Sequence, residues 1–442
     1  PWITNTDLTT AAFITGQLGH TYAFYSIARD KVGNEEAAPA EPDTTTRVSI
    51  VVATEENDTI VLRVDPADAE RLQVFVNAST SGEPTYALPM AAADSLHIAA
   101  LAGNDTLIID LGNGNPISGS LSFDGGDGQD VLQIITGNAG QTLFADGTKI
   151  RFTGGTVDYS GLEGMAIEGS AADDSLTITA ALPFTPSFHG GSGNDTLTIQ
   201  AGDYVLTSDT TSGTANLHLV ANSTAKVNLA GLQSLASLTI DDSAQVSLAA
   251  GGDKVLITRD LSINGNGVLD LADNDLIVQA TPATRQEVLT QVSSWIKSAR
   301  NTSPQKWTGW GITSIAARNG ARQFTGLAPV LNDQGNGKPI LGTFAGVSVG
   351  TNDILVKYTW NGDVNLDGKV DIADYFLVDS GFITQKGGYR NGDLNFDGTI
   401  TGGAVDISDY FLIDAAFIGQ DAVLATKAPS PLQQLFSTKP LL

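Results

Sequence analysis

The chain has 442 residues with 49 acidic and 23 basic side chains, and its formal net charge is −26 at pH 7. It contains no cysteine, which excludes a disulfide framework, thiol catalysis and cysteine-ligated zinc or iron–sulfur sites. The negative charge without a basic cluster argues against nucleic acid as a partner. No apolar run reaches the roughly 18 residues of a membrane-spanning helix, so we expect no membrane span.

The acidic residues are mostly aspartate, with 39 Asp and 10 Glu. Aspartate and glycine favour turns, whereas glutamate favours helices. The composition therefore predicts a mainly β protein with many turns and with carboxylates available for calcium.

Residues 1–45 contain one alternating run, Thr21–Ala28, followed by a turn and a proline-bearing segment. This pattern resembles the last strands of a fibronectin type III or immunoglobulin-like domain. The resemblance implies that residues 1–45 are the C-terminal part of a β-sandwich. The chain starts at Pro1 without a signal peptide, so we expect a processed product or a fragment. The segment 38–46 is predicted to be a linker.

Residues 46–280 form a series of short apolar triplets separated by Gly, Asn and Asp turns. The strands expected from Leu238 and from Val246 each recur after 23 residues, at Leu261 and Leu269, and the strand expected at Val255–Ile257 recurs after 22 residues, at Ile277. Leu261–Ile263 is expected to be a separate strand. A repeat of 20 to 25 residues with three short strands predicts a right-handed parallel β-helix-like solenoid. The alternative is an array of β-sandwiches, which would require hairpins with two-residue turns.

Residues 281–357 are predicted to cap the solenoid, because solenoid ends expose unpaired strands. One helical face is expected from Val288 to Ala299, since apolar residues there recur at helical spacing. A Gly- and Trp-rich stretch follows, and a strand at residues 354–358 closes the region. We expect Trp307 and Trp310 to pack under the glycine-rich loop rather than to stack on sugar.

The most specific motif begins at Asp363 and reads DVNLDGKVDIAD. Oxygen-bearing side chains stand at positions 1, 3, 5, 9 and 12, Gly368 permits a sharp turn at position 6, and position 7 offers a carbonyl. Calcium binds six to eight oxygen ligands, and alternate residues of a tight turn can all point at one ion. The predicted ligands are Asp363, Asn365, Asp367, the Lys369 carbonyl, Asp371 and Asp374.

The motif recurs from Asp393, and the words after each loop also match, DIADYFLVDSGFI and DISDYFLIDAAFI. Two loop–helix units with Asp at position 12 and only an exiting helix resemble the dockerin type I module. The resemblance covers residues 360–420 and implies a small α-helical domain, placed at 358–420, that holds two Ca²⁺ ions. By resemblance the second ligand set is Asp393, Asn395, Asp397, the Thr399 carbonyl, Asp406 and Asp409. Residues 421–442 are left as a tail.

Two features depart from the dockerin pattern. The second loop carries five extra residues, 400–404, so its site is expected to be weaker or to need rearrangement. Dockerins usually recognise their cohesin partner through positions 10 and 11, which here are Ile372 and Ala373 and then Ile407 and Ser408. The partner is therefore expected to be a cohesin-like or another surface protein. Four carboxylates in the first loop repel one another, so we expect the module to be loose or unfolded without calcium.

Two nonapeptides, Gly125–Gln133 and Gly190–Thr198, match the G-G-x-G-x-D repeat and resemble RTX β-rolls. In that family the nonapeptides run in tandem, whereas here the two begin 65 residues apart. Each is a half-site, so a Gly-Asp turn is favoured, and a further calcium ion near Asp130 or Asp195 is the less favoured alternative.

Together these features predict an extracellular or cell-surface bacterial repeat protein with a structural or adhesion role, attached through its calcium module. We assign no catalytic residue. The alternative is a polysaccharide-degrading β-helix enzyme, a lyase or glycoside hydrolase, recruited through the same module. Such an enzyme would need a trio of carboxylates with Arg or Lys on one coil face, and the sequence shows none.

Overall fold

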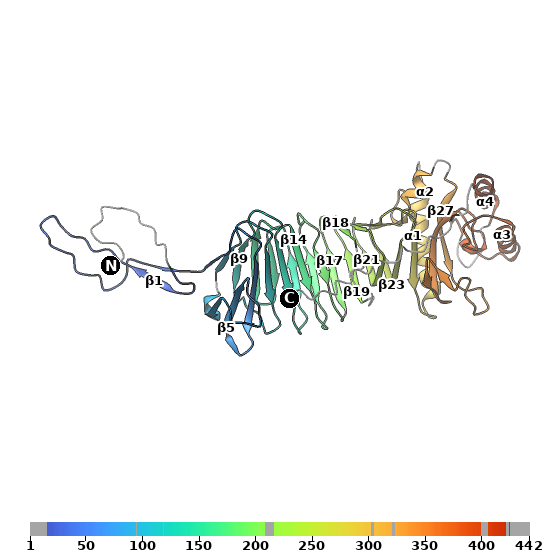
Figure 1. Ribbon diagram of the computed structural model, residues 1–442. Coiled ribbons are helices and arrows are strands. Elements are labelled where there is room, and N and C mark those ends of the chain that lie inside the picture. Colours follow the sequence, from blue (N-terminus) through green and yellow to red (C-terminus); the bar gives the residue numbers. More distant parts are fainter. Residues whose placement is uncertain are drawn as a thin grey trace. The chain divides into compact units, whose positions relative to one another are not determined.

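The computed structural model describes residues 16–420, except 94, 118, 208–215, 302–304, 321–322 and 399–404, and also residue 424. The described chain is mainly β with large parallel sheets, as the composition predicted, and Figure 1 labels its elements. It divides into two compact units. The first comprises residues 1–137 and 148–165, and the second comprises residues 138–147 and 166–442.

The N-terminal part of the first unit contains one antiparallel pair, β1 (Thr21–Phe24) and β2 (Thr44–Arg47). Tyr22 and Phe24 are half-buried, whereas Tyr25 is exposed, so the strand ends earlier than the alternation predicted. β2 begins inside the segment predicted to be a linker. The three threonines from Thr44 to Thr46 lie in this strand because β-branched side chains favour extended backbone.

The rest of the first unit is built from two parallel ladders. One ladder pairs β3 (Ile50–Val52), β7 (Leu96–Ala99), β9 (Ser120–Asp124) and β13 (Gly155–Ser160). The other pairs β4 (Thr59–Asp65), β8 (Thr106–Asp110) and β10 (Val131–Ile135). Strands from successive turns of the chain thus stack on one another, which is a solenoid-like winding.

Antiparallel hairpins interrupt these ladders at two points. β5 (Asp68–Val76) folds back on β4 and then pairs β6 (Tyr86–Pro89), which the short 3-10 helix η1 (Met90–Ala92) follows. β12 (Lys149–Phe152) pairs β13 through the tight turn at Thr153 and Gly154. Hairpins were expected only for the β-sandwich alternative, and here they are insertions in a parallel framework.

The second unit is also built from two parallel ladders, and in addition β14 (Gly164–Glu168) pairs in parallel with β16 (Ser187–His189). The longer ladder contains β11 (Thr142–Ala145), β15 (Ser175–Ile178), β17 (Asp195–Ile199), β19 (Leu217–Ala221), β21 (Gln233–Ile240), β23 (Val255–Ile263) and β25 (Asp275–Gln279). The shorter contains β18 (Asp203–Leu206), β20 (Lys226–Leu229), β22 (Gln245–Leu248), β24 (Val268–Asp270) and β26 (Gly311–Thr313).

The predicted register is correct where the triplets are most regular. Leu238 pairs with Leu261 and Val246 pairs with Leu269, at the predicted spacing of 23 residues. The third spacing is wrong: Ile277 pairs with Ile257 and not with Val255. The triplets Val255–Ile257 and Leu261–Ile263 also belong to one strand, β23, rather than to two. The side chains alternate between buried and partly exposed along most strands, so apolar residues at every second position form the core.

The cap begins with α1 (Arg285–Arg300), whose buried side chains include Val292, Ile296 and Ala299, as the helical spacing predicted. After β26 and the short helix α2 (Ile315–Asn319), the chain adds β27 (Thr325–Leu331), the pair β28 (Thr343–Phe344) and β29 (Val347–Ser348), and β30 (Asp353–Trp360). β30 pairs antiparallel with β25, and β27 pairs antiparallel with β30. Trp307 is buried as expected, but Trp310 is 57 % exposed.

β27 is the last strand of its sheet in the described chain, and Pro329 stands in its middle, opposite Val356. Five of its seven residues are buried. After β30 the chain forms α3 (Ile372–Thr384), the 3-10 turn η2 (Tyr389–Asn391) and α4 (Ile407–Gly419). β27 contacts η2, so the C-terminal helical region lies against the end of the sheet. Among the described residues, no helix is both long and apolar enough to cross a membrane.

Candidate metal centre

The first loop, between β30 and α3, is organised around the buried carboxylate of Asp363. Its Oδ1 accepts the backbone N–H of Asp367 at 3.0 Å, and its Oδ2 accepts that of Gly368 at 2.8 Å. Gly368 has φ +91°, a conformation that glycine adopts without steric cost, so the chain can turn sharply at position 6 as the motif predicted. These bonds curl the loop around a carboxylate that solvent does not reach.

Asp374 closes the loop from the first turn of α3. Its Oδ1 accepts the N–H groups of Val364 and Asn365 at 3.0 and 3.2 Å, and its Oδ2 accepts that of Asp371 at 3.0 Å. Asp371 is the N-cap of α3 and accepts the N–H of Ala373, so Asp371 and Asp374 form a reciprocal capping box. The residues at positions 9 and 12 of the motif, Asp371 and Asp374, thus cap the N-terminus of α3 and also belong to the loop.

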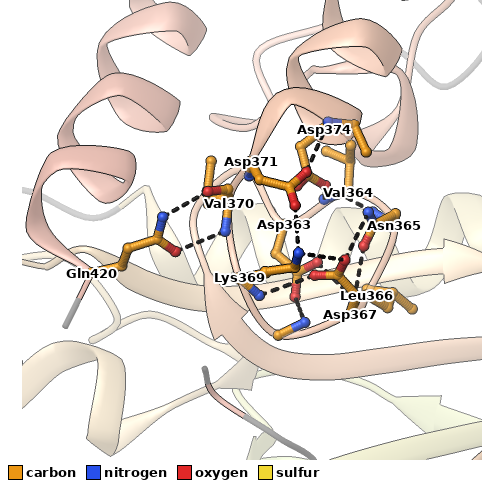
Figure 2. Close-up of polar contacts among 12 residues, drawn as sticks. Asp363, Val364, Asn365, Leu366, Asp367, Lys369, Val370, Asp371, Asp374 and Gln420 are labelled. Carbon is orange, nitrogen blue, oxygen red and sulfur yellow. Dashed lines mark hydrogen bonds and ion pairs between the residues drawn. The ribbon is translucent and has the colours of Figure 1, made fainter. Parts of the chain in front are cut away.

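Three carboxylates of the first loop converge. One oxygen each from Asp363, Asp367 and Asp374 lie within 4.8 Å of one another (Figure 2). Asn365 lies beside them and donates from Nδ2 to Asp367 at 3.2 Å. Asp371 instead forms an ion pair with Lys369 at 2.5 Å. The structure therefore brings together three of the four predicted carboxylate ligands, and the fourth faces a lysine.

The donor set is a fit for calcium, because carboxylate and amide oxygens from one tight turn are the ligands that this ion prefers. Burial raises the pKa of Asp374 to about 7, and the neighbouring charge of Asp363 adds to this effect. Burial also raises the pKa of Asp363. Ionised carboxylates are thus disfavoured here without a cation, and a divalent ion would reverse that preference.

Gln420, at the C-terminal end of α4, holds the first loop from outside. Its side-chain amide donates to the Val370 carbonyl at 2.6 Å and accepts the Val370 N–H at 2.8 Å (Figure 2). The N–H of Leu424 donates to the Gly368 carbonyl at 2.7 Å. Sequence reasoning did not anticipate these contacts, because they join residues 50 or more positions apart.

The second loop repeats most of this geometry. Oδ1 of Asp409 accepts the N–H groups of Leu394 and Asn395, and its Oδ2 accepts that of Asp406, the N-cap of α4. Burial raises the pKa of Asp409 to about 6. Asn395 donates to Asp397 at 2.9 Å, as its counterpart does in the first loop.

Asp393, the first residue of the second loop, is buried, and its Oδ1 has no hydrogen-bond partner in the described chain. A buried carboxylate oxygen without a donor is costly and is a natural position for a cation. The predicted ligand Thr399 and the insertion at residues 400–404 lie outside the described residues. In the described part of the chain, only the first loop has three carboxylates close enough for one ion.

The outer faces of α3 and α4 expose large apolar side chains at matching positions of the two repeats. Ile372 and Ile407 are 83 % and 71 % exposed, and Phe376 and Phe411 are 71 % and 69 % exposed. Ile383 and Ile418 near the helix ends are equally exposed. Exposed apolar clusters of this kind mark interaction surfaces.

The two RTX-like half-sites lie at turns that precede strands. Asp130 accepts the N–H of Asp105 at 2.8 Å in the first unit, and Asp195 accepts that of Asp174 at 2.9 Å in the second. Each aspartate thus accepts a hydrogen bond from the backbone of the preceding coil and stabilises the turn there. Oδ2 of Asp105 and of Asp130 are buried without a partner, and neither belongs to a three-carboxylate group within the described residues.

Comparison of the chain with family models, with curated proteins and with solved structures gives no match in any of the three. The likeness of residues 360–420 to dockerin type I modules therefore rests on the loop motif and on its duplication.

Proposed function

We propose that this chain is a secreted or surface-associated repeat protein without a catalytic role, in which a solenoid carries a calcium-binding, dockerin-like module that attaches it to a protein partner. The convergence of Asp363, Asp367 and Asp374 is the observation that carries this proposal. We also propose that the solenoid winds as a right-handed β-helix, the hand that parallel crossovers adopt.

In the first loop, calcium would be held by Asp363, Asn365, Asp367 and Asp374, with the Lys369 carbonyl and Asp371 completing the set. In the second loop, the ion would be held by Asp393, whose buried Oδ1 has no hydrogen-bond partner in the described chain. The other ligands would be Asn395, Asp397, Asp406 and Asp409. The bound ion would neutralise carboxylates that burial disfavours and would join each loop to the first turn of its helix.

The exposed faces of α3 and α4 support an attachment role. Their apolar residues match between the repeats and neither helix contains Lys or Arg, so the surface fits an apolar partner surface, cohesin-like or other. An extracellular location would supply calcium at the concentration that weaker calcium modules need.

Calorimetric calcium titration of the full chain tests the proposal. We expect saturable binding that Asp363→Asn weakens in the first loop and Asp393→Asn weakens in the second. Asp68→Asn removes an exposed carboxylate in the β4–β5 hairpin and serves as the charge-matched control. Binding that is unchanged in the Asp363→Asn/Asp393→Asn double variant would place calcium elsewhere and overturn the proposal.

A further inference from the structure

Lys357 is a buried cation directly beneath the first loop. It lies in β30 and is 2 % exposed. Its Nζ donates to the Leu366 carbonyl in the middle of the loop at 2.8 Å and lies 3.8 Å from Oδ2 of Asp363. A buried ammonium is costly unless paired, so this lysine and the loop carboxylate compensate each other.

Lys357 also faces a carboxylate of the solenoid. Asp275 of β25 precedes Leu276, which pairs with Val356, so the antiparallel register places Asp275 opposite Lys357. The side chain of Asp275 is almost fully buried and accepts the N–H of Tyr358 at 3.3 Å. The lysine therefore lies between a solenoid carboxylate and a loop carboxylate.

Arg300 is a buried cation beside the second loop. It ends α1 and is 3 % exposed. Its Nη1 lies 3.4 Å from the Asn395 carbonyl, which also accepts the Asn301 side-chain amide at 2.9 Å. The charges of Asp409 and Asp393 raise the pKa of Arg300, against the larger lowering effect of burial, so both loop carboxylates lie within its electrostatic reach.

Both contacts use a backbone carbonyl in the first half of a loop, at positions that differ by one residue. Lys357 reaches the carbonyl of Leu366, at position 4, and Arg300 reaches that of Asn395, at position 3. Leu366 and Phe396 are equivalent in the two loops, and both have positive φ, +64° and +60°. Each carbonyl meets a buried cation that comes from the cap rather than from the loop itself. The two cations come from different elements, β30 and α1, and both elements lie outside the duplicated loop–helix units.

We propose that the cap supplies one internal cation to each metal loop, Lys357 to the first and Arg300 to the second, and that these cations hold the metal-free module on the cap and lower its calcium affinity. This inference rests on the proposed calcium-binding function. A positive charge buried near a divalent ion repels it, because little water lies between them to screen the interaction. The same charge stabilises the loop carboxylates when the ion has left.

The test uses the full chain with one loop silenced at a time. Lys357→Met is made in an Asp393→Asn background, and Arg300→Met in an Asp363→Asn background. Each substitution is expected to tighten calcium binding at its own loop about tenfold and to lower the thermal midpoint in calcium-free buffer. Lys226→Met removes an exposed positive charge from β20, and it is expected to leave the calcium affinity within about twofold and the thermal midpoint unchanged.

The predicted gain in calcium affinity and the predicted loss of stability without calcium have opposite signs, and a side chain that only supports the loop sterically would not produce both. Methionine substitutions that weaken calcium binding, or leave it unchanged, would overturn the inference while leaving the proposed function intact. Absence of calcium binding at both loops of the parent chain would overturn the proposed function and the inference with it. If Lys357→Met fails to fold, the Arg300→Met result decides alone, since α1 and the second loop provide an independent instance.

Discussion

Tyr375 of α3 donates a hydrogen bond from its hydroxyl to Asp414 of α4 at 2.5 Å, and Tyr410 of α4 donates back to Asp379 of α3 at 2.6 Å. The two tyrosine donors are 35 residues apart in the sequence, and so are the two aspartate acceptors. The rings repeat the exchange, because Tyr375 packs edge-on against Phe417 and Tyr410 packs against Phe382 in the same way. The two loop–helix units therefore pack as a reciprocal pair, although their loops differ in length.

Removing either hydroxyl should cost the same. Tyr375→Phe and Tyr410→Phe each delete one hydrogen bond to a carboxylate near the surface, so we expect each to lower the free energy of unfolding by about 1 kcal/mol. Urea unfolding followed by circular dichroism measures this value. Tyr25→Phe, at an exposed position of the N-terminal segment, is the control. A clearly unequal loss for the two variants would contradict reciprocal packing.

Gly381 marks where the two repeats differ. A Cβ added there would lie 1.9 Å from the Asn391 carbonyl, whereas the matching position in α4 is the buried alanine Ala416. Gly381→Ala should therefore destabilise the module by about 1–3 kcal/mol, despite the better helix propensity of alanine. Gly342→Ala is the matched control, since nothing lies within 4 Å of its added Cβ. Equal thermal midpoints for the two variants would show that α3 can shift without cost.

The carboxylate of Asp130 uses one oxygen and leaves the other buried without a donor. Burial raises the pKa of this carboxyl group, in agreement with a costly charge. In calcium-free buffer at pH 7, Asp130→Asn keeps the acceptor for the Asp105 N–H and removes the charge, so it should raise the thermal midpoint. Asp130→Ala removes the acceptor as well and should destabilise by about 1–3 kcal/mol. A lower thermal midpoint for Asp130→Asn would contradict this prediction and would indicate that the negative charge of Asp130 stabilises the fold.

The calcium-free module should lose stability as pH rises. The folded-state pKa of Asp374 is about 7 and that of Asp409 is about 6, both above the value near 3.9 of an unfolded chain. The folded state therefore binds these protons more tightly, and the stability they contribute is present below about pH 4 and disappears through pH 6 to 7.

Thermal unfolding in calcium-free buffer between pH 4.5 and 8 checks this dependence. We expect Asp374→Asn/Asp409→Asn to flatten the decline, because neither side chain can then ionise. Saturating calcium should remove the decline in the parent chain, since the ion favours the charged carboxylates. A midpoint that rises with pH in the absence of calcium would contradict the buried, protonated state.

Local sequence was sufficient for the regular parts of the fold. Apolar triplets around Leu238 predicted the pairing with Leu261, because each coil can bury its side chains only on its neighbours. The spacing from Asp363 to Asp374 predicted the first loop and its helix, because those contacts lie within twelve residues. The β12–β13 hairpin was missed, since its short strands resemble coil triplets and only their pairing distinguishes them.

The contacts that join distant segments were not predictable from the motifs. Lys357 stands in a strand and Arg300 ends a helix, and nothing in either segment indicates a carboxylate loop nearby. The expectation that the module is loose without calcium considered only the charges of the loop. It stays a prediction for residues 358–420 alone, which lack both cations, whereas the full chain retains them.

The end of the sheet at β27 has a consequence for how molecules behave in solution. If the helical module were to leave its place, a nearly apolar strand would become accessible along one side, and such a strand can recruit a strand from another molecule. Pro329 has no N–H to offer in the middle of that side. A second molecule could therefore not extend the ladder without a break, which protects the protein against end-to-end polymerisation at the moment when its cover is removed.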